Sequence, residues 1–404
     1  MQSKKIVLIS YHTPTIENVR GPSALPYHLL VERDESVEVV VYTFNANGLS
    51  HEQVKNMEQR LNVKIHCLPM PAWYQWMMRL HLLFLRIILP LPYLCYLKLS
   101  RRHVDVIKGS TPDFVWIYGE ELIGIVRQMD GMKRVHLGPD TESLYYYRML
   151  GRRFVMNDAL DYWKCAMMYR KYARMERELP SDENYTFFAV GEEDVRHLQQ
   201  LNPKVNAKFM RHPHYEVSKL KIENGELKIK FHQPKIKLLI AGRYDLYMQQ
   251  AADELFEELK NGRIEKLRNQ YSITFLGKGW EKHVESLRQA GWDVQHITFA
   301  PDYVEEITKH DIQITPIAIG TGTKGKVLDA LANGLLVIGT SHAMENIAVE
   351  NGVSCIEYHQ PQEVIKVLKD ILANRAKYEA MAKVGQEAVL KWHDRELLAR
   401  EVLG

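Results

Sequence analysis

The second half of the chain alternates short runs rich in β-branched and aromatic residues with longer stretches of helical periodicity. The short runs predict strands over 237–241, 272–276, 294–298, 312–315, 335–338 and 353–356. The longer stretches predict helices over 249–260, 281–290, 302–309, 324–333 and 361–374. Strands that alternate with helices are typical of βαβ units, so we expect a complete doubly wound parallel sheet here.

The first half repeats this α/β pattern less regularly. Strand-like runs occupy 6–9, 37–42, 63–66, 114–117, 134–137 and 186–189. The stretch 216–234 has few large apolar residues and a turn-like Glu223-Asn-Gly-Glu226, so it is the best candidate for a linker between two domains. We therefore expect one domain over 1–215 and another over 235–385. A C-terminal helix over 386–404, interrupted near Trp392, follows, and we hypothesise that it crosses back to the first domain.

Composition narrows the class of protein. Lys and Arg number 53 against 50 Asp and Glu, and a net charge of +3 does not favour nucleic-acid binding. The four cysteines lie far apart with no C-x-x-C pair, which fits a reducing compartment and a cytoplasmic location. The apolar run after Met1 gives way to polar residues by Tyr11, too soon for a signal peptide, so it predicts a buried strand.

The segment 73–102 stands out because no Asp or Glu occurs between residues 59 and 104, whereas Arg and Lys recur. A membrane-spanning helix needs about 20 predominantly apolar residues, and Arg86, Pro90 and Pro92 interrupt this run. Aromatic and aliphatic residues mixed with basic ones suit a helix lying on an anionic lipid surface. The alternative is a buried core helix with snorkelling arginines.

The stretch 319–340 reads as a strand end, a glycine-rich turn, a helix and a further strand. Such a turn brings backbone amides and the positive end of a helix to a phosphate, and Lys324 and Lys326 add charge. The spacing of Gly320, Gly322 and Gly325 also fits a dinucleotide fingerprint, with Glu345 about 20 residues on. That fingerprint normally opens the first βαβ unit, whereas several strands precede it here.

A Walker A loop is the other alternative for the same stretch. Gly325 and Lys326 fit it, but Val327 stands where a Ser or Thr must hold Mg²⁺.

The flanking residues favour a third interpretation. The stretch from Gly320 to Gly334, with 337–340 and 345–347 after it, resembles the signature of the group 1 (family 4-like) glycosyltransferases of the GT-B fold. The stretches 242–251, 300–304 and 311–316 resemble other landmarks of that family's nucleotide-binding domain. The resemblance implies two Rossmann-like domains that face a cleft, with the nucleotide-sugar donor bound by the second.

The resemblance implies roles for individual residues. Arg243 and Lys326 would bind the diphosphate, and Asp329 would hold the ribose hydroxyls. The full set of implied donor-binding residues is Gly21, Gly242, Arg243, Gly320, Gly322, Thr323, Lys324, Lys326, Asp329, Glu345 and His212. Simpler interpretations stay open: a surface ion pair for Arg243, a solvated helix carboxylate for Asp329 and a helix N-terminal charge for Glu345.

Two departures from the family's pattern bear on activity. Thr321 stands where the family has its first Glu, which usually meets the donor sugar, and Met248 stands near the place of a frequent Lys. These departures keep open a catalytically degenerate GT-B domain that acts as a nucleotide-binding or scaffold protein. A nucleotide-sugar epimerase is the other alternative.

The first domain would hold the acceptor. Gly21-Pro-Ser-Ala24 stands where GT-B enzymes place a glycine-rich loop, although a plain turn fits as well. Asp140 follows a predicted strand and is the candidate general base, with an N-cap of a helix over 143–149 as the alternative. Glu192 and His212 also follow strands and are further candidates for donor or acceptor contact.

We therefore expect a glycosyltransferase that moves a sugar from a UDP- or GDP-linked donor to a glycan or lipid-linked acceptor, in polysaccharide biosynthesis. The expected catalytic residues are Asp140, Lys326 and Arg243. No bound metal or other cofactor is expected, since GT-B enzymes neutralise the leaving diphosphate with basic side chains and helix dipoles. The segment 73–102 adds the hypothesis of peripheral contact with the inner face of the plasma membrane.

Overall fold

The computed structural model describes residues 4–16, 21–152, 156, 159–215, 217–218, 222–223, 226–227, 231, 235–260 and 264–404. The chain forms two compact units. Met1–Pro213 and Arg395–Gly404 make the first, and His214–Asp394 makes the second. Most of the predicted linker 216–234 lies outside the described residues, but β8 (Ile222–Glu223) and β9 (Glu226–Leu227) pair there in antiparallel fashion.

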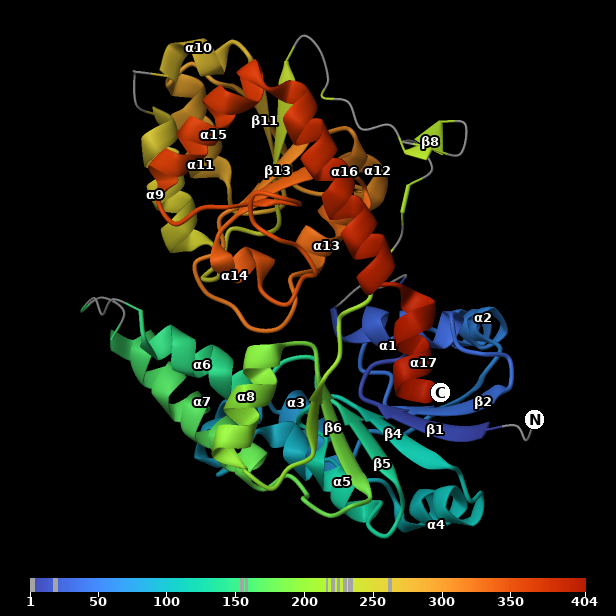
Figure 1. The fold of residues 1–404 in the computed structure, drawn as a ribbon. Helices are drawn as coiled ribbons and strands as arrows, with labels where there is room; N and C mark the ends of the chain where they lie inside the picture. Colours follow the sequence, from blue (N-terminus) through green and yellow to red (C-terminus); the bar gives the residue numbers. More distant parts are fainter. Residues whose placement is uncertain are drawn as a thin grey trace. The chain divides into compact units, whose positions relative to one another are not determined.

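The first unit is built on a seven-stranded parallel sheet in the order β3-β2-β1-β4-β5-β6-β7 (Figure 1). Its strands are β1 (Lys4–Ser10), β2 (Val37–Thr43), β3 (Lys64–Cys67), β4 (Phe114–Tyr118), β5 (Arg134–Leu137), β6 (Tyr185–Ala189) and β7 (Ala207–Phe209). The six predicted strands are confirmed to within two residues at each end. β7 was not predicted, because three residues are too short for a readable pattern.

Helices and short 3-10 turns connect these strands. They are α1 (Gly21–Val31), α2 (His51–Leu61), α3 (Ala72–Arg79), η1 (Leu82–Ile88), η2 (Tyr93–Tyr96), α4 (Arg101–Gly109), α5 (Ile123–Gln128), α6 (Glu142–Leu150), α7 (Ala159–Arg177) and α8 (Glu192–Leu201). Successive side chains of a strand point to opposite faces. Ile6 and Leu8 accordingly join one hydrophobic core, and Val7 and Ile9 join the other. Both faces of the sheet are thus covered.

The second unit holds a six-stranded parallel sheet in the order β12-β11-β10-β13-β14-β15. Its strands are β10 (Ile236–Ala241), β11 (Tyr271–Leu276), β12 (Asp293–Ile297), β13 (Ile312–Thr315), β14 (Leu336–Gly339) and β15 (Ile356–Glu357). Its helices are α9 (Gln249–Lys260), α10 (Glu265–Arg268), α11 (Glu281–Gln289), α12 (Tyr303–Thr308), α13 (Gly325–Ala332), α14 (Ser341–Met344), α15 (Pro361–Ala373) and α16 (Arg375–Trp392).

One strand prediction in this unit was wrong in position. The last strand was expected over 353–356, but it begins only at Ile356. Gly352 adopts a left-handed backbone (φ +78°), and the chain turns through 352–354 before it can extend. The other predicted strands and helices of this unit are confirmed, with ends that differ by one residue.

The tail is helical on both sides of a break at His393–Asp394, as its aromatic interruption predicted. The His393 ring is fully buried, and its Nε2 accepts a hydrogen bond from the Ala348 N–H at 3.0 Å. Beyond the break, α17 (Arg395–Leu403) belongs to the first unit and packs against α1 (Figure 1). Arg395 also pairs with Glu32 there, at 3.2 Å between nitrogen and oxygen.

Two adjacent leucines of α17 give a direct test of this packing. Leu398 is 2% exposed within the core of the first unit, whereas Leu397 is 50% exposed. We expect Leu398→Ala to lower the free energy of unfolding of the first unit by about 2–5 kcal/mol, because it leaves a cavity. Leu397→Ala should change it by less than about 0.5 kcal/mol. Urea unfolding measures both, and equal effects would contradict the packing.

Candidate functional site

The glycine-rich turn of the second unit joins β13 to α13. Lys324 is the N-cap residue of α13, and its ammonium folds back to donate to the carbonyls of Thr321 and Gly322, at 2.6 and 3.0 Å. A Cβ on Gly320 would lie 2.6 Å from the Cε of Lys324, so a larger residue there would displace the end of this lysine side chain. In this structure Lys324 therefore fixes the shape of the turn from within.

Lys326 lies in the first turn of α13 and has different surroundings. Its ammonium lies against Gly242, which directly follows β10, so that a Cβ on Gly242 would be 2.7 Å from Nζ. Nζ also donates to the Met248 sulfur at 3.1 Å. Burial lowers the pKa of Lys326 to about 8, although Asp245 opposes the shift. A desolvated ammonium thus stands beside the positive end of a helix, an arrangement that attracts anions.

Gly242 and Arg243 form the turn at the carboxyl end of β10, the strand next to β13. Gly242 has φ +113°, a conformation that side-chain-bearing residues rarely adopt. The Arg243 side chain is exposed, and it makes no ion pair with any residue that the structure describes.

Asp329 lies one turn further along α13 and is buried. Burial raises its pKa to about 7, and a hydrogen bond from the Tyr215 backbone N–H opposes that shift. The alternative of a solvated helix carboxylate is therefore wrong. The hydroxyl of Tyr303 is buried and has no hydrogen-bond partner among the described residues, and burial together with the nearby Asp329 raises its pKa.

The loop after α14 supports the glycine-rich turn. Asn346, at φ +68°, donates its side-chain N–H to the Gly322 carbonyl at 2.9 Å. The sequence pattern alone predicts no role for Asn346, because only the folded loop brings it to Gly322. Glu345 caps the carboxyl end of α14, so its interpretation as a helix N-terminal charge is wrong.

Gly21, Asp140 and His212 all lie in the first unit. Gly21 opens α1, so Gly21–Ala24 is the first turn of a helix rather than a loop or plain turn. Burial lowers the pKa of His212 to about 4, and its Nδ1 lies 2.8 Å from the Pro213 carbonyl. The Glu192 carboxylate pairs with Arg196 on α8 at 3.3 Å.

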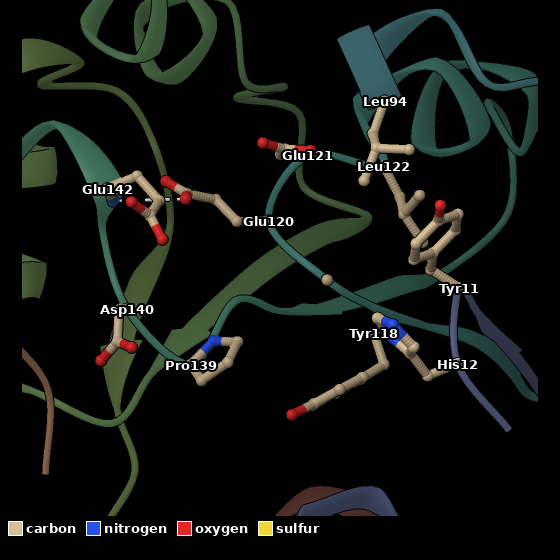
Figure 2. Close-up of a pocket in the computed structure, with 11 residues that line it drawn as sticks. Tyr11, His12, Leu94, Tyr118, Glu120, Glu121, Leu122, Pro139, Asp140 and Glu142 are labelled. Carbon is tan, nitrogen blue, oxygen red and sulfur yellow. Dashed lines mark hydrogen bonds between the residues drawn. The ribbon is translucent and has the colours of Figure 1, made fainter. Parts of the chain in front are cut away.

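Asp140 lines a pocket of about 230 Å³ at the carboxyl ends of β4 and β5 (Figure 2). Thr141 is the N-cap residue of α6, so the N-cap interpretation of Asp140 is wrong. Glu120, Glu121 and Glu142 line the same pocket. Sequence reasoning missed the first two, although a Gly-Glu-Glu directly after an apolar strand was a usable signal.

These glutamates are packed against other acids. Burial and the nearby Glu176 raise the pKa of Glu120 well above its usual range. The Glu142 N–H donates to Glu120 at 3.3 Å, and burial with surrounding carboxylates raises the pKa of Glu142 to about 8. Tyr172 donates a hydrogen bond to Glu121. At neutral pH, the Glu142 carboxyl is therefore mostly protonated and can donate a hydrogen bond.

The basic, aromatic segment 73–102 forms α3, η1 and η2 and the start of α4. Its apolar patch, which we define as Trp76, Leu80, Phe84, Ile87 and Ile88, is exposed by 45–74%. The alternative of a buried core helix is therefore wrong for these residues. Lys171 of α7 donates to the carbonyls of Arg86 and Ile87, at 2.7 and 2.8 Å, and holds η1 in place. Among the described residues, no helix has the length and apolar character needed to cross a membrane.

Residues 235–374 match the family model described as "Glycosyl transferases group 1". They form a group 1 glycosyltransferase domain. The match spans the turn after β10, the glycine-rich turn and Asp329. No curated protein sequence is similar enough to this chain to count as a relative.

Solved structures extend the comparison to the whole chain. Anabaena HepE in complex with UDP-glucose has a TM-score of 0.61 at 13% identity, over 98% of each chain. WaaG, a glycosyltransferase involved in lipopolysaccharide biosynthesis, has 0.59 at 14% identity, over 99% of this chain and 100% of its own. Sucrose-phosphate synthase from Thermosynechococcus elongatus has 0.62 at 12% identity, over 98% and 97%. The predicted GT-B fold is thereby confirmed.

Two glycines with left-handed backbones test the contact between Gly242 and Lys326. Gly352→Ala meets nothing within 4 Å, so we expect it to cost only backbone strain, about 1–2 kcal/mol. Gly242→Ala adds a collision with Nζ, so its loss of unfolding free energy should be larger, at about 2–4 kcal/mol. Urea unfolding of the two variants, each with Lys326 kept and with Lys326→Ala, measures the difference. A difference that persists unchanged without the lysine side chain would mean that it does not come from a contact between Lys326 and Gly242.

Proposed function

We propose that this protein transfers a sugar from a UDP- or GDP-linked nucleotide sugar to an acceptor bound by its first unit. The observation that carries the proposal is the Lys326 ammonium, desolvated against Gly242 at the N-terminus of α13, within a group 1 glycosyltransferase domain. HepE, which has a similar fold, was solved with UDP-glucose and with UDP. The leaving group of such a donor is a nucleoside diphosphate, and these positive groups suit its charge.

Because this chain departs from the family's pattern, few side chains are left to neutralise the negative charge of the diphosphate. Met248, in place of a frequent Lys, is buried and contacts the Lys326 ammonium through its sulfur. Lys324 is engaged by the carbonyls of its own turn. We therefore assign the stabilisation of the departing diphosphate mainly to Lys326 and Arg243, with the helix dipole and turn amides, including those of Gly322 and Thr323.

On the acceptor side, Asp140 is our candidate for the general base, because it lines the acidic pocket of the first unit. A carboxylate there would take the proton of the acceptor group as the new bond forms. Asp329 remains our candidate for the ribose hydroxyls, and Glu345 and His212 remain candidates for further donor contacts. No metal ion enters this mechanism.

Nucleotide binding tests the donor site. UDP or GDP at 100 times its dissociation constant should stabilise the native protein by about 2.7 kcal/mol. We expect Lys326→Ala to lose most of the thermal shift, because one of the few cations at the site is gone. Lys366→Ala, which removes an exposed lysine of α15, should keep it.

The outcomes separate the alternatives. Stabilisation by NAD alone would overturn the assignment of the turn to a nucleotide sugar. Nucleotide binding without turnover, whichever acceptor is added, would favour a degenerate scaffold. Release of free nucleotide without any acceptor would favour an epimerase or hydrolase over a transferase.

We further propose that the acceptor is a lipid-linked or cell-surface glycan precursor, and that the apolar patch on α3 and η1 rests on an anionic membrane. The patch combines exposed aromatic and aliphatic side chains with Arg79 and Arg86, and residues 59–104 contain no acidic side chain. Apolar burial and attraction to anionic headgroups would then act together.

Vesicle flotation tests the membrane contact. Vesicles containing phosphatidylglycerol should carry the native protein, and vesicles of phosphatidylcholine alone should carry several-fold less. Phe84→Ser should reduce the bound fraction, since Phe84 is 65% exposed in the patch. Phe299→Ser, at a residue 75% exposed in the second unit, is the matched control and should not. Failure of anionic vesicles to carry the native protein would remove the proposal.

A further inference from the structure

We propose that Gln313 is a positioning residue for Lys326, through which the core of the second unit holds the first turn of α13 where the diphosphate site requires it. This inference rests on the proposed transfer function and deepens the account of the same site. Gln313 lies on β13. Its side-chain Nε2 donates to the Lys326 carbonyl at 3.1 Å and to the Thr315 hydroxyl at 3.0 Å.

A buried glutamine is unusual in a strand that is covered on both faces. All four residues of β13 are buried, and Gln313 is 0% exposed. Such strands are usually apolar throughout, because burying an amide is unfavourable unless its polar atoms are hydrogen-bonded. Among the described residues, the Oε1 of Gln313 has no hydrogen-bond donor. An apolar side chain of similar size would avoid this cost, so the advantage of the amide must lie in the two bonds of Nε2.

Those two bonds fix the orientation of the amide. The Lys326 carbonyl can only accept a hydrogen bond, so the reverse orientation would set Oε1 against another oxygen. Gln313 and Thr315 are two residues apart on one strand, and their side chains therefore point to the same face of the sheet. This is the face that α13 covers, since Gln313 reaches the first turn of that helix.

The contacts of Gln313 belong to a closed ring that ends at the Lys326 ammonium. β13 pairs with β10, and Gln313 lies opposite Leu239 in that pairing. β10 ends at Ala241, and Gly242 follows it. The Lys326 ammonium lies against Gly242, where a Cβ would be 2.7 Å from Nζ. The sheet thus fixes Gly242, and the Gln313 amide fixes the Lys326 backbone relative to the same pair of strands.

This ring sets the position of the charge that the proposed reaction uses. Stabilisation of a leaving group depends on donors that are in place before the reaction, and a misplacement of about 1 Å can cost roughly 100-fold in rate. A lysine ammonium ends a flexible stem, so its position depends on the backbone turn that carries it. Lys324 cannot replace it here, because the carbonyls of Thr321 and Gly322 engage its ammonium. Gln313 therefore acts through Lys326 and needs no contact with the nucleotide.

Gln386 provides a matched control at the other end of α13. It lies on α16, which packs against α13 (Figure 1), and it is 1% exposed. Its Nε2 donates to the Ala332 carbonyl at 2.7 Å, and its Oε1 also has no donor in the part of the chain that the structure describes. Gln386→Met therefore removes the same kind of bond from the same helix, but at the carboxyl end of α13 instead of the turn that carries Lys326.

Nucleotide titration of the variants tests the inference, with UDP or GDP as the ligand, whichever binds the native protein. We expect Gln313→Met to raise the dissociation constant about fivefold. The urea midpoint should stay unchanged or rise, because a buried oxygen without a donor is removed. Gln386→Met should change the dissociation constant by less than about twofold. In a protein that already carries Lys326→Ala, Gln313→Met should also have an effect below about twofold, since the ammonium through which it acts is gone.

Several results would overturn the inference. Unchanged binding in Gln313→Met, or equal weakening by Gln313→Met and Gln386→Met, would mean that the bond to the Lys326 carbonyl has no particular effect on the site. An effect that persists undiminished beside Lys326→Ala would mean that Gln313 does not act through the lysine. Failure of both Gln313→Met and Gln313→Leu to fold would make the glutamine a structural residue. In all these cases nucleotide binding by the native protein leaves the proposed function standing, whereas binding of neither UDP nor GDP would remove both.

Discussion

A parallel sheet covered on both faces leaves polar chemistry only at its ends, and this constraint shapes both units. All five residues of β4 and all four of β13 are buried, so neither strand can present a polar group to a ligand along its length. The chain becomes polar where the strands stop. In the first unit Glu120 and Glu121 follow β4 at once, and in the second the glycine-rich turn follows β13. Ligands of open α/β sheets bind at this edge for the same reason.

The two units bury ionisable groups of opposite type, one basic and the others acidic. The second keeps a lysine ammonium largely away from water beside a helix N-terminus, and the first keeps several carboxyls close together. Burial lowers the pKa of the lysine and raises the pKa values of the carboxyls. Both shifts favour the neutral form, because a desolvated charge without a partner is unfavourable. The second unit is therefore prepared for an anion, such as the diphosphate of the proposed donor.

Much of the fold follows from local sequence, because apolar runs and helical periodicity are properties of neighbouring residues. The glycine-rich turn was predictable for the same reason. The different roles of Lys324 and Lys326 were not, since they depend on which carbonyls and which distant glycine each ammonium meets. The contact between Glu120 and Glu176 joins residues far apart in the chain, and no local pattern signals it. The exposure of Phe84 likewise depends on how little of the first unit covers η1.

Because α17 belongs to the first unit, that unit can complete its core only after the last residues of the chain have been synthesised. Residues 214–394, which make up the second unit, leave the ribosome before residues 395–404 do. The second unit can therefore fold while the first still lacks a helix that buries part of its core, including Leu398 and Leu403. Domains generally complete in the order of their synthesis, but here the unit that begins first finishes last. Until then, the apolar surface beside α1 is open to chaperones.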